Sequence, residues 1–325
     1  MKIFITGATG FIGTHVIQRL TLTDHELYCL ARNTSNVEEL QKLGVNIVTG
    51  DVTDKESLVQ PMKGCDWVIN LANVYSLWVP SKKTYTDVNI KGTQNVMECA
   101  LETDVSKVVH VSTVGIYGKP EHSPFKEDTP VGPARFSEYA RSKYEGDLIA
   151  WDFYEKKGLP LVVIYPAGVL GPGDTKFTGK IIQRLIYRKM PATAFPDSVF
   201  TYVHVRDVAE TIVRAAEKEN NIGEKYIVGK YQLSMKEFYE MVSEISGVPL
   251  PKIHLPGSVV MVNAVLLTWL ANLIKKPPIW GMSIDGVRMG KQGVKANGSK
   301  AERELGITYT PIRVALKEAI ESYKM

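Results

Sequence analysis

Short apolar runs alternate in the first half of the chain with segments whose apolar residues recur at helical spacing. The runs have the length and the β-branched content of buried strands, and they lie at 2–5, 26–31, 45–49, 67–71, 107–112 and 161–165. The segments with helical spacing lie at 13–20, 37–42, 55–63, 86–103 and 137–157. Strands and helices that alternate in this way predict an α/β fold with a doubly wound parallel sheet.

A glycine-rich run follows the first predicted strand directly. It reads Thr6-Gly7-Ala8-Thr9-Gly10-Phe11-Ile12-Gly13, and a helical segment begins behind it. Glycine permits a tight turn and close approach of the backbone to a phosphate, and the start of a helix offers unpaired N–H groups to the anion. The glycine spacing differs from the commoner Gly-x-Gly-x-x-Gly. The run nevertheless predicts a Rossmann-type fold whose dinucleotide pyrophosphate contacts Gly7, Thr9, Gly10, Phe11, Ile12 and Gly13.

The regular alternation ends after Pro166, where a stretch containing Gly171-Pro172-Gly173-Asp174 interrupts it. Residues 201–219 again have the pattern of a strand and a helix, and we expect them to return to the first domain. The predicted dinucleotide-binding domain therefore comprises residues 1–168 together with 199–219. Residues 169–198 and 220–325 are predicted to form a smaller, interleaved substrate-binding lobe.

One segment of the second lobe is almost entirely apolar. Residues 259–274 contain only three polar side chains, and Lys275-Lys276-Pro277-Pro278 follows them. Sixteen residues are too few to cross a bilayer easily. The segment is therefore either a helix buried in the protein or an interfacial helix that contacts a membrane peripherally.

Composition excludes some partners and leaves others open. The chain has 325 residues, 44% hydrophobic and 23% charged, and a formal net charge of +4. Because the lysines are scattered, we expect no nucleic-acid partner.

Cys29, Cys65 and Cys99 lie far apart in apolar or helical segments, which indicates reduced core cysteines. No histidines have the spacing of metal ligands. The sequence begins in a predicted strand, so we expect a cytoplasmic protein, peripheral at a membrane if 259–274 is interfacial.

Tyr139 and Lys143 lie four residues apart in a predicted helix and therefore share one face of it. A free tyrosine has a pKa of about 10, and a nearby ammonium group favours the phenolate. Lys143 is thus expected to lower the pKa of Tyr139. A surface pair of this spacing is common by chance, so the assignment depends on the neighbouring motifs.

The strand at 107–112 ends in two hydroxyl residues, Ser112 and Thr113, followed by Val114-Gly115-Ile116-Tyr117-Gly118. A hydroxyl at this edge of a parallel sheet can bond a substrate carbonyl or alkoxide. With these motifs the chain resembles the extended short-chain dehydrogenase/reductase family over nearly its whole length. The resemblance implies a catalytic triad of Thr113, Tyr139 and Lys143, with Ser112 as the fallback for Thr113.

The resemblance also implies further cofactor contacts along the strand ends. These are Asp51, Val52, Leu71, Ala72, Asn73, Asn89, Pro166 and Val169, together with Tyr139 and Lys143. Asp51 could instead cap a turn, and Asn89 could be a structural amide that holds two helices together. Two residues depart from the family pattern: Asn70 stands where relatives often have His, and Tyr165 stands where many have Arg.

Arg32 follows the second predicted strand, where an acidic residue would accept the adenosine ribose hydroxyls of NAD. A guanidinium there suits a 2′-phosphate, so we expect NADP(H) in preference to NAD(H). A solvent-exposed arginine without a ligand is the alternative.

Within the family, the stretch 72–80 and the apolar segment 259–274 are similar to the dihydroflavonol-reductase, 3β-hydroxysteroid-dehydrogenase and hopanoid-associated branch. This resemblance implies NADPH-dependent reduction of an apolar carbonyl, or the reverse oxidation, with Thr113 at the substrate. Tyr75 and Trp78 follow the fourth predicted strand and either pack on the substrate or pack within their own loop. A nucleotide-sugar epimerase or dehydratase is the alternative, and Arg184, Arg188 and Arg288 could serve its pyrophosphate. A membrane-surface steroid-type dehydrogenase is a variant of the main hypothesis. The resemblance further implies a homodimer formed through helices 86–103 and 137–157, whose apolar residues could instead simply cover the sheet.

Overall fold

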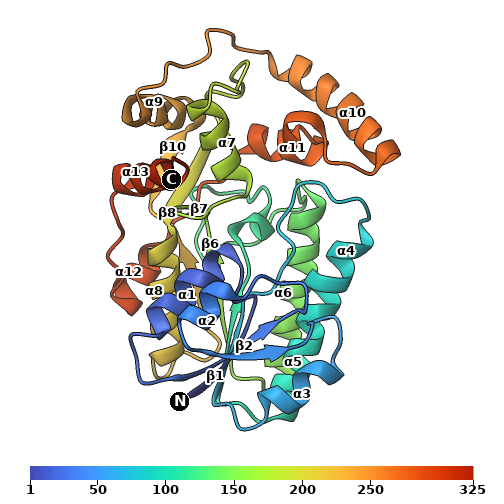
Figure 1. The fold of residues 1–325 in the computed structure, drawn as a ribbon, viewed down its shortest axis with the longest axis vertical. Coiled ribbons are helices and arrows are strands. Elements are labelled where there is room, and N and C mark those ends of the chain that lie inside the picture. The colour runs from blue at the N-terminus through green and yellow to red at the C-terminus, as the bar shows by residue number, and fades with distance from the viewer. Residues whose placement is uncertain (325) are drawn as a thin grey trace.

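A seven-stranded sheet forms the centre of the protein, for which the computed structural model describes residues 1–324 (Figure 1). Its strand order is β3-β2-β1-β4-β5-β6-β9, and every neighbouring pair is parallel. The strands are β1 (Lys2–Thr6), β2 (Glu26–Ala31), β3 (Asn46–Thr49), β4 (Trp67–Asn70), β5 (Lys107–Val111), β6 (Leu161–Pro166) and β9 (Lys225–Val228). The predicted α/β, Rossmann-type doubly wound parallel sheet is therefore confirmed.

Helices cover both faces of this sheet because successive strand side chains point in opposite directions. In β1, Ile3 and Ile5 pack in one core cluster and Phe4 in the other. The helices with the first cluster are α1 (Phe11–Leu20), α2 (Glu38–Lys42), α8 (Val205–Glu217) and α12 (Ser299–Leu305). Those with the second are α3 (Glu56–Met62), α5 (Gly92–Glu102) and α6 (Glu138–Lys157). Cys29, Cys65 and Cys99 are buried in these clusters, as predicted.

The predicted helix 86–103 is divided in the structure. A short α4 (Lys83–Tyr85) leads into a π-helical segment, η1 (Thr86–Lys91), before α5 begins at Gly92. Helix α6 packs closely on η1 at Gly146, where a Cβ atom would lie 2.4 Å from the Asn89 carbonyl oxygen. Leu101 and Leu148 are the exposed large hydrophobic residues described on α5 and α6, and the homodimer remains a prediction.

The smaller lobe contains a second sheet of order β10-β8-β7. Its strands are β7 (Gly168–Leu170), β8 (Val199–His204) and β10 (Tyr231–Ser234). Helices α7 (Phe177–Ile186), α9 (Met235–Ser246) and α13 (Ile312–Ser322) share one core cluster with it. Beyond them lie α10 (Gly257–Ile274), the short turn η3 (Ile279–Gly281) and α11 (Ile284–Gln292) (Figure 1).

The two lobes interleave, but individual elements differ from the expected division. Helix α8 returns to the large sheet and packs against α1, β5 and β6, whereas β8, from the same segment 199–219, joins the small sheet. Strand β9 lies in the segment 220–325 and yet forms the edge of the large sheet beside β6. A four-residue strand carries little signal in the sequence, because its assignment depends on a partner distant along the chain.

Helix α10 is mostly exposed, which excludes the first of its two alternatives, a helix buried in the protein. Only 17% of its residues are buried, at Val260, Ala264 and Ala271. The helix is long and apolar enough to cross a membrane by length and composition alone. Most of its apolar side chains are exposed, so burial within this chain does not explain its composition.

Candidate active site

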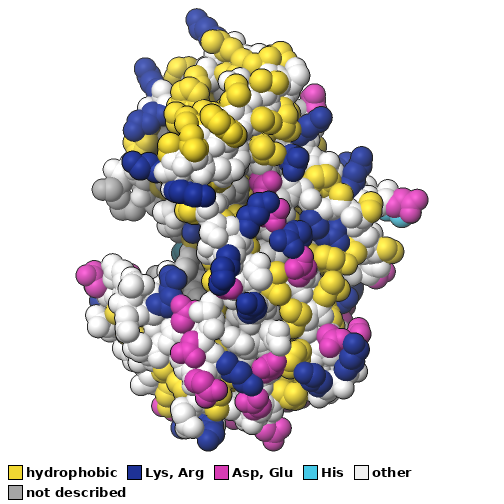
Figure 2. Space-filling model, turned by 90° about the vertical axis from the view of Figure 1, so that its right-hand side faces the viewer, with side chains coloured by type: hydrophobic (Ala, Val, Ile, Leu, Met, Phe, Trp, Pro, Cys, Tyr) yellow, Lys and Arg dark blue, Asp and Glu magenta, His cyan; other side chains and the backbone are white. Residues whose placement is uncertain are grey.

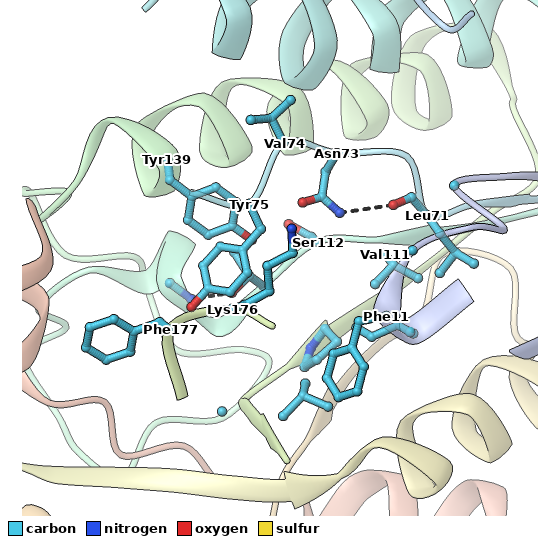
Figure 3. Close-up of a pocket in the computed structure, with 18 of the residues that line it drawn as sticks. Phe11, Leu71, Asn73, Val74, Tyr75, Val111, Ser112, Tyr139, Lys176 and Phe177 are labelled. Carbon is cyan, nitrogen blue, oxygen red and sulfur yellow. Dashed lines mark hydrogen bonds between the residues drawn. The ribbon is translucent and has the colours of Figure 1, made fainter. Parts of the chain in front are cut away.

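A cavity of about 490 Å³ lies at the carboxyl ends of the large sheet's strands and extends into the smaller lobe (Figure 3). Figure 3 shows Phe11 and Leu71 at one end of it and Tyr75, Tyr139 and Phe177 at the other. Most of the predicted cofactor residues line this cavity. They are Gly7, Thr9, Gly10, Phe11, Ile12, Gly13, Arg32, Asp51, Val52, Leu71, Ala72, Asn73, Tyr139, Pro166 and Val169.

The glycine-rich turn between β1 and α1 has no room for side chains at two positions. Gly7 has φ +70°, and a Cβ atom on it would lie 2.7 Å from the Ala72 nitrogen. A Cβ atom on Gly13 would lie 2.2 Å from the Gly7 carbonyl oxygen. Gly10 caps α1 without a side chain, so the helix directs its first N–H groups into the cavity wall. This geometry fits the pyrophosphate of a dinucleotide.

Arg32, after the end of β2, and Asp51, after the end of β3, both line the cavity. Arg32 follows β2 and is exposed, and Ser35 lines the same wall. Asp51 Oδ1 accepts hydrogen bonds from the Thr53 amide and from the Thr53 hydroxyl, each at 2.9 Å. Asp51 therefore stabilises a turn and also faces the cavity. Sequence reasoning missed Ser35, which belongs to no motif.

A buried chain of hydrogen bonds joins the ends of β1, β4 and β5. Thr6 Oγ1 donates to Asn70 Oδ1 at 2.6 Å, and Asn70 Nδ2 lies 3.0 Å from His110 Nδ1. The amide of Ala72 in turn donates to Thr6 Oγ1 at 3.1 Å. Asn70 therefore joins three neighbouring strands and holds the start of the loop that carries Ala72.

Tyr139 and Thr113 meet at the wall of the cavity. Ser137 caps α6 by accepting from the Ala140 amide at 3.0 Å, which starts the helix immediately before Tyr139. Thr113 accepts from the Gly115 amide at 3.2 Å. Burial raises the pKa of Tyr139, and the neighbouring Thr113 hydroxyl opposes that rise. The pair can therefore present a protonated phenol to a ligand.

Lys143 lies behind this pair and does not line the cavity. It is buried, and its Nζ donates to the Val111 carbonyl at 2.9 Å. Burial lowers the pKa of Lys143 to about 8, and the Asp147 carboxylate opposes this shift. Desolvation dominates the pKa of Tyr139, and the Lys143 ammonium group donates to the backbone of β5. The expected lowering of the Tyr139 pKa by Lys143 therefore stays a prediction.

Two other predicted contacts also lie outside the cavity lining. Asn89 Oδ1 accepts from the Val74 amide at 2.7 Å, and its Nδ2 donates to Ser142 Oγ at 2.9 Å. It thus has the structural role that the sequence left open, since it holds the loop after β4 against α6. Trp78, expected at the substrate, instead donates from Nε1 to Asn272 Oδ1 of α10 at 2.9 Å. The loop turns away from the cavity after Tyr75, so Trp78 packs toward the outer layer.

The remaining half of the cavity has predominantly aromatic and apolar walls. Tyr75 packs on Tyr139 with ring centroids 4.7 Å apart. The walls further include Phe136, Phe177, Ile181, Phe200, Tyr202, Phe238, Met289 and Val294. Sequence reasoning found only Tyr75 among these residues. No short motif connects the others, because they come from segments far apart in the chain.

Basic side chains are scarce around the cavity. Among the described lining residues only Arg32 and Lys176 are basic. Arg184, Arg188 and Arg288, which the epimerase alternative assigned to a sugar-linked pyrophosphate, do not line it. The Asp174 carboxylate accepts from the Lys176 and Gly179 amides, each at 2.7 Å, and so is engaged at the start of α7.

The sequence profile described as "NAD dependent epimerase/dehydratase family" matches residues 3–229, which contain the glycine turn, Thr113, Tyr139 and Lys143. The chain belongs to this family. As a member of this extended short-chain dehydrogenase/reductase family, it is an NAD(P)-dependent oxidoreductase.

Individual relatives of this family member cover nearly its whole length. A Synechocystis protein named putative dihydroflavonol 4-reductase is 31% identical over 330 residues, which are 99% of this chain and 94% of the relative. Sterol demethylase protein B of Methylococcus capsulatus is 26% identical over 100% of this chain and 98% of its own. The crystal structure of gox2253 superposes with a TM-score of 0.85 at 32% identity, covering 99% of this chain and 97% of that one.

Proposed function

We propose that this protein is an NADP(H)-dependent reductase of an apolar or aromatic aldehyde or ketone, or catalyses the reverse alcohol oxidation. The observation that carries the proposal is the aromatic, nearly uncharged half of the cavity directly beside Thr113 and Tyr139. An apolar molecule gains free energy by leaving water for such walls. The Synechocystis relative, named as a reductase, supports the same reaction class.

The proposed roles follow from the side-chain contacts. Tyr139 donates its phenolic proton to the carbonyl oxygen. Because its pKa is raised, the phenol stays protonated until this transfer. Thr113, which lines the same cavity as Tyr139, orients the carbonyl. Lys143, one helical turn further along α6, supplies a buried positive charge as Tyr139 loses its proton. A bound nicotinamide dinucleotide supplies the hydride.

Arg32 supports NADP(H) in preference to NAD(H). Its guanidinium is exposed at the end of the cavity, and the described residues include no carboxylate that pairs with it. A 2′-phosphate can accept two of its N–H groups at once. Ser35 adds a hydroxyl to the same wall.

The test is oxidation of NADPH, with NADH in parallel, over aldehydes, aryl ketones, steroid ketones and nucleotide sugars. We expect turnover of an apolar carbonyl with NADPH, lost in Tyr139→Phe and retained in Tyr187→Phe, which makes the same change at an exposed tyrosine outside the cavity. Conversion of a nucleotide sugar without net oxidation of NADPH, and no turnover of any apolar carbonyl, would contradict the proposal and establish the epimerase or dehydratase alternative.

A further inference from the structure

Helix α10 exposes an apolar surface that no described segment of the chain covers. Its exposed side chains are Val259, Val262, Val265, Leu266, Trp269, Leu270, Leu273 and Ile274. Ile279 and Trp280 of the following turn η3 are 54% and 55% exposed and extend this surface. Figure 2 shows hydrophobic side chains gathered at the top of the molecule, where α10 lies. Large exposed apolar patches mark interaction sites.

The charged residues that flank α10 in the sequence are basic. Lys252 precedes α10 and Lys275 and Lys276 follow it, and all three are exposed. Between residues 248 and 298 the only acidic residue is Asp285, whose carboxylate accepts from the Glu138 amide at 2.8 Å. None of the three lysines forms an ion pair within the described residues, so their charges are available to a partner.

The opposite side of α10 is fixed to the protein. Val260 and Ala264 pack with Val287 of α11 in a small core cluster. Thr268 Oγ1 accepts from the Ile284 amide at 3.0 Å, and Trp78 bonds Asn272 at 2.9 Å. Spanning a bilayer would break these contacts. The helix is therefore placed to lie along a surface.

We propose that α10 and η3 form a docking surface for an anionic phospholipid bilayer, with α10 in the plane of the interface. Exposed Trp269 and Trp280 are the side chains that membrane interfaces favour, and Lys252, Lys275 and Lys276 meet anionic headgroups. A second copy of this chain fits less well. The lysines stand before and after the helix, so pairing two copies of α10 in either direction brings like charges together.

The docking surface is connected to the cavity. The loop that carries Tyr75 makes two hydrogen bonds toward the docking surface. Trp78 of this loop donates to Asn272 of α10, and the Leu77 carbonyl accepts from the Ser283 hydroxyl at 2.8 Å. At the end of α11, Met289 and Gln292 line the cavity itself. Docking would therefore hold one wall of the cavity next to the lipid surface. The docking proposal does not depend on which reaction the enzyme catalyses.

The test is co-sedimentation of the full chain with vesicles of phosphatidylcholine alone or of an equal mixture of phosphatidylcholine and phosphatidylglycerol. We expect strong binding to the mixed vesicles, together with a blue shift of tryptophan fluorescence. The double variant Leu266→Ser/Leu273→Ser is expected to lower the apparent partition constant about tenfold or more. Leu22→Ser, at a leucine 81% exposed outside α10, is the matched control and is expected to bind like the unaltered protein.

A charge variant tests the second component of the surface. Lys275→Glu/Lys276→Glu is expected to weaken binding to the mixed vesicles several-fold, and Lys63→Glu/Lys119→Glu, with the same net charge, to leave it unchanged. Failure to bind either vesicle overturns the proposal, as does equal binding by all variants. Self-association of the unaltered chain that the leucine variant abolishes, without vesicle binding, would assign the surface to a second copy instead.

Discussion

The two halves of the cavity are built in different ways. The nucleotide half consists largely of backbone at the glycine turn and at the ends of neighbouring parallel strands, where clashes within 3 Å exclude side chains at Gly7 and Gly13. The substrate half consists largely of aromatic side chains from α7, β8 and α9 and from the loop after β4, with Met289 of α11. The first half recognises a fixed shape through the main chain, whereas the second can change its ligand through single substitutions.

Loss of the phenolic hydroxyl is expected to have the largest effect, because the chemistry occurs where the two halves meet. In Tyr139→Phe, kcat should fall about 1,000-fold, since a positioned general acid is removed. The dissociation constant for NADPH, measured by quenching of intrinsic fluorescence, should stay near that of the unaltered protein. A comparable loss of NADPH affinity would mean that Tyr139 acts mainly in cofactor binding.

A methyl group in the glycine turn should damage the nucleotide half alone. Gly13→Ala places a Cβ atom 2.2 Å from the Gly7 carbonyl oxygen, so the turn must shift and NADPH binding should weaken about 100-fold. Calorimetric titration with NADPH measures the change. The control is Gly290→Ala, where the nearest atom, from Phe195, is 3.7 Å away and no effect is expected.

Arg32→Ser should change the preference between the two cofactors. Removing a charge-assisted contact to the 2′-phosphate should raise the KM for NADPH about 30-fold and leave that for NADH nearly unchanged. Steady-state kinetics with both cofactors measure this. An equal change for both would place Arg32 away from the 2′ position.

Phe177→Ala should affect only the substrate half. Truncating one aromatic wall should raise the KM for an apolar carbonyl about tenfold, with NADPH affinity retained. A matched Phe153→Ala variant is unsuitable because Phe153 is buried in the core, so Tyr187→Phe at the surface serves as the control. An unchanged KM would show that substrate does not reach α7.

Lys143 is expected to control how the rate of reduction depends on pH. Burial lowers its pKa to about 8, so the ammonium is present below that pH and is lost as pH rises through it. We expect kcat/KM for reduction to be halved at about pH 8 and to continue falling above it. Lys143→Arg, which keeps its charge, should move this decline to higher pH. A profile that is flat to pH 10 would exclude Lys143 as the controlling group.

Local sequence patterns predicted the nucleotide half well and the substrate half poorly. The turn at Gly7–Gly13 is continuous in sequence, so the spacing of its glycines is enough to predict its structure. Phe177, Phe200 and Phe238 meet only because three separate elements pack together. The position of Trp78 could not be decided from the sequence because nothing local shows that its loop turns toward α10. The sequence also could not decide between a buried and an interfacial α10, because apolar composition alone does not show whether a face has a partner.

The interleaved path of the chain has a consequence for folding cooperativity. Val208 and Ile212 of α8 cover the same face of the sheet as Ile5, yet they follow the whole α7–β8 excursion into the other lobe. A fragment cut at residue 168 would keep α1 and α2 on that face but would lack α8 and the edge strand β9. Neither lobe is therefore an autonomous module that recombination could transplant, and substrate specificity in this scaffold diversifies residue by residue within one folding unit.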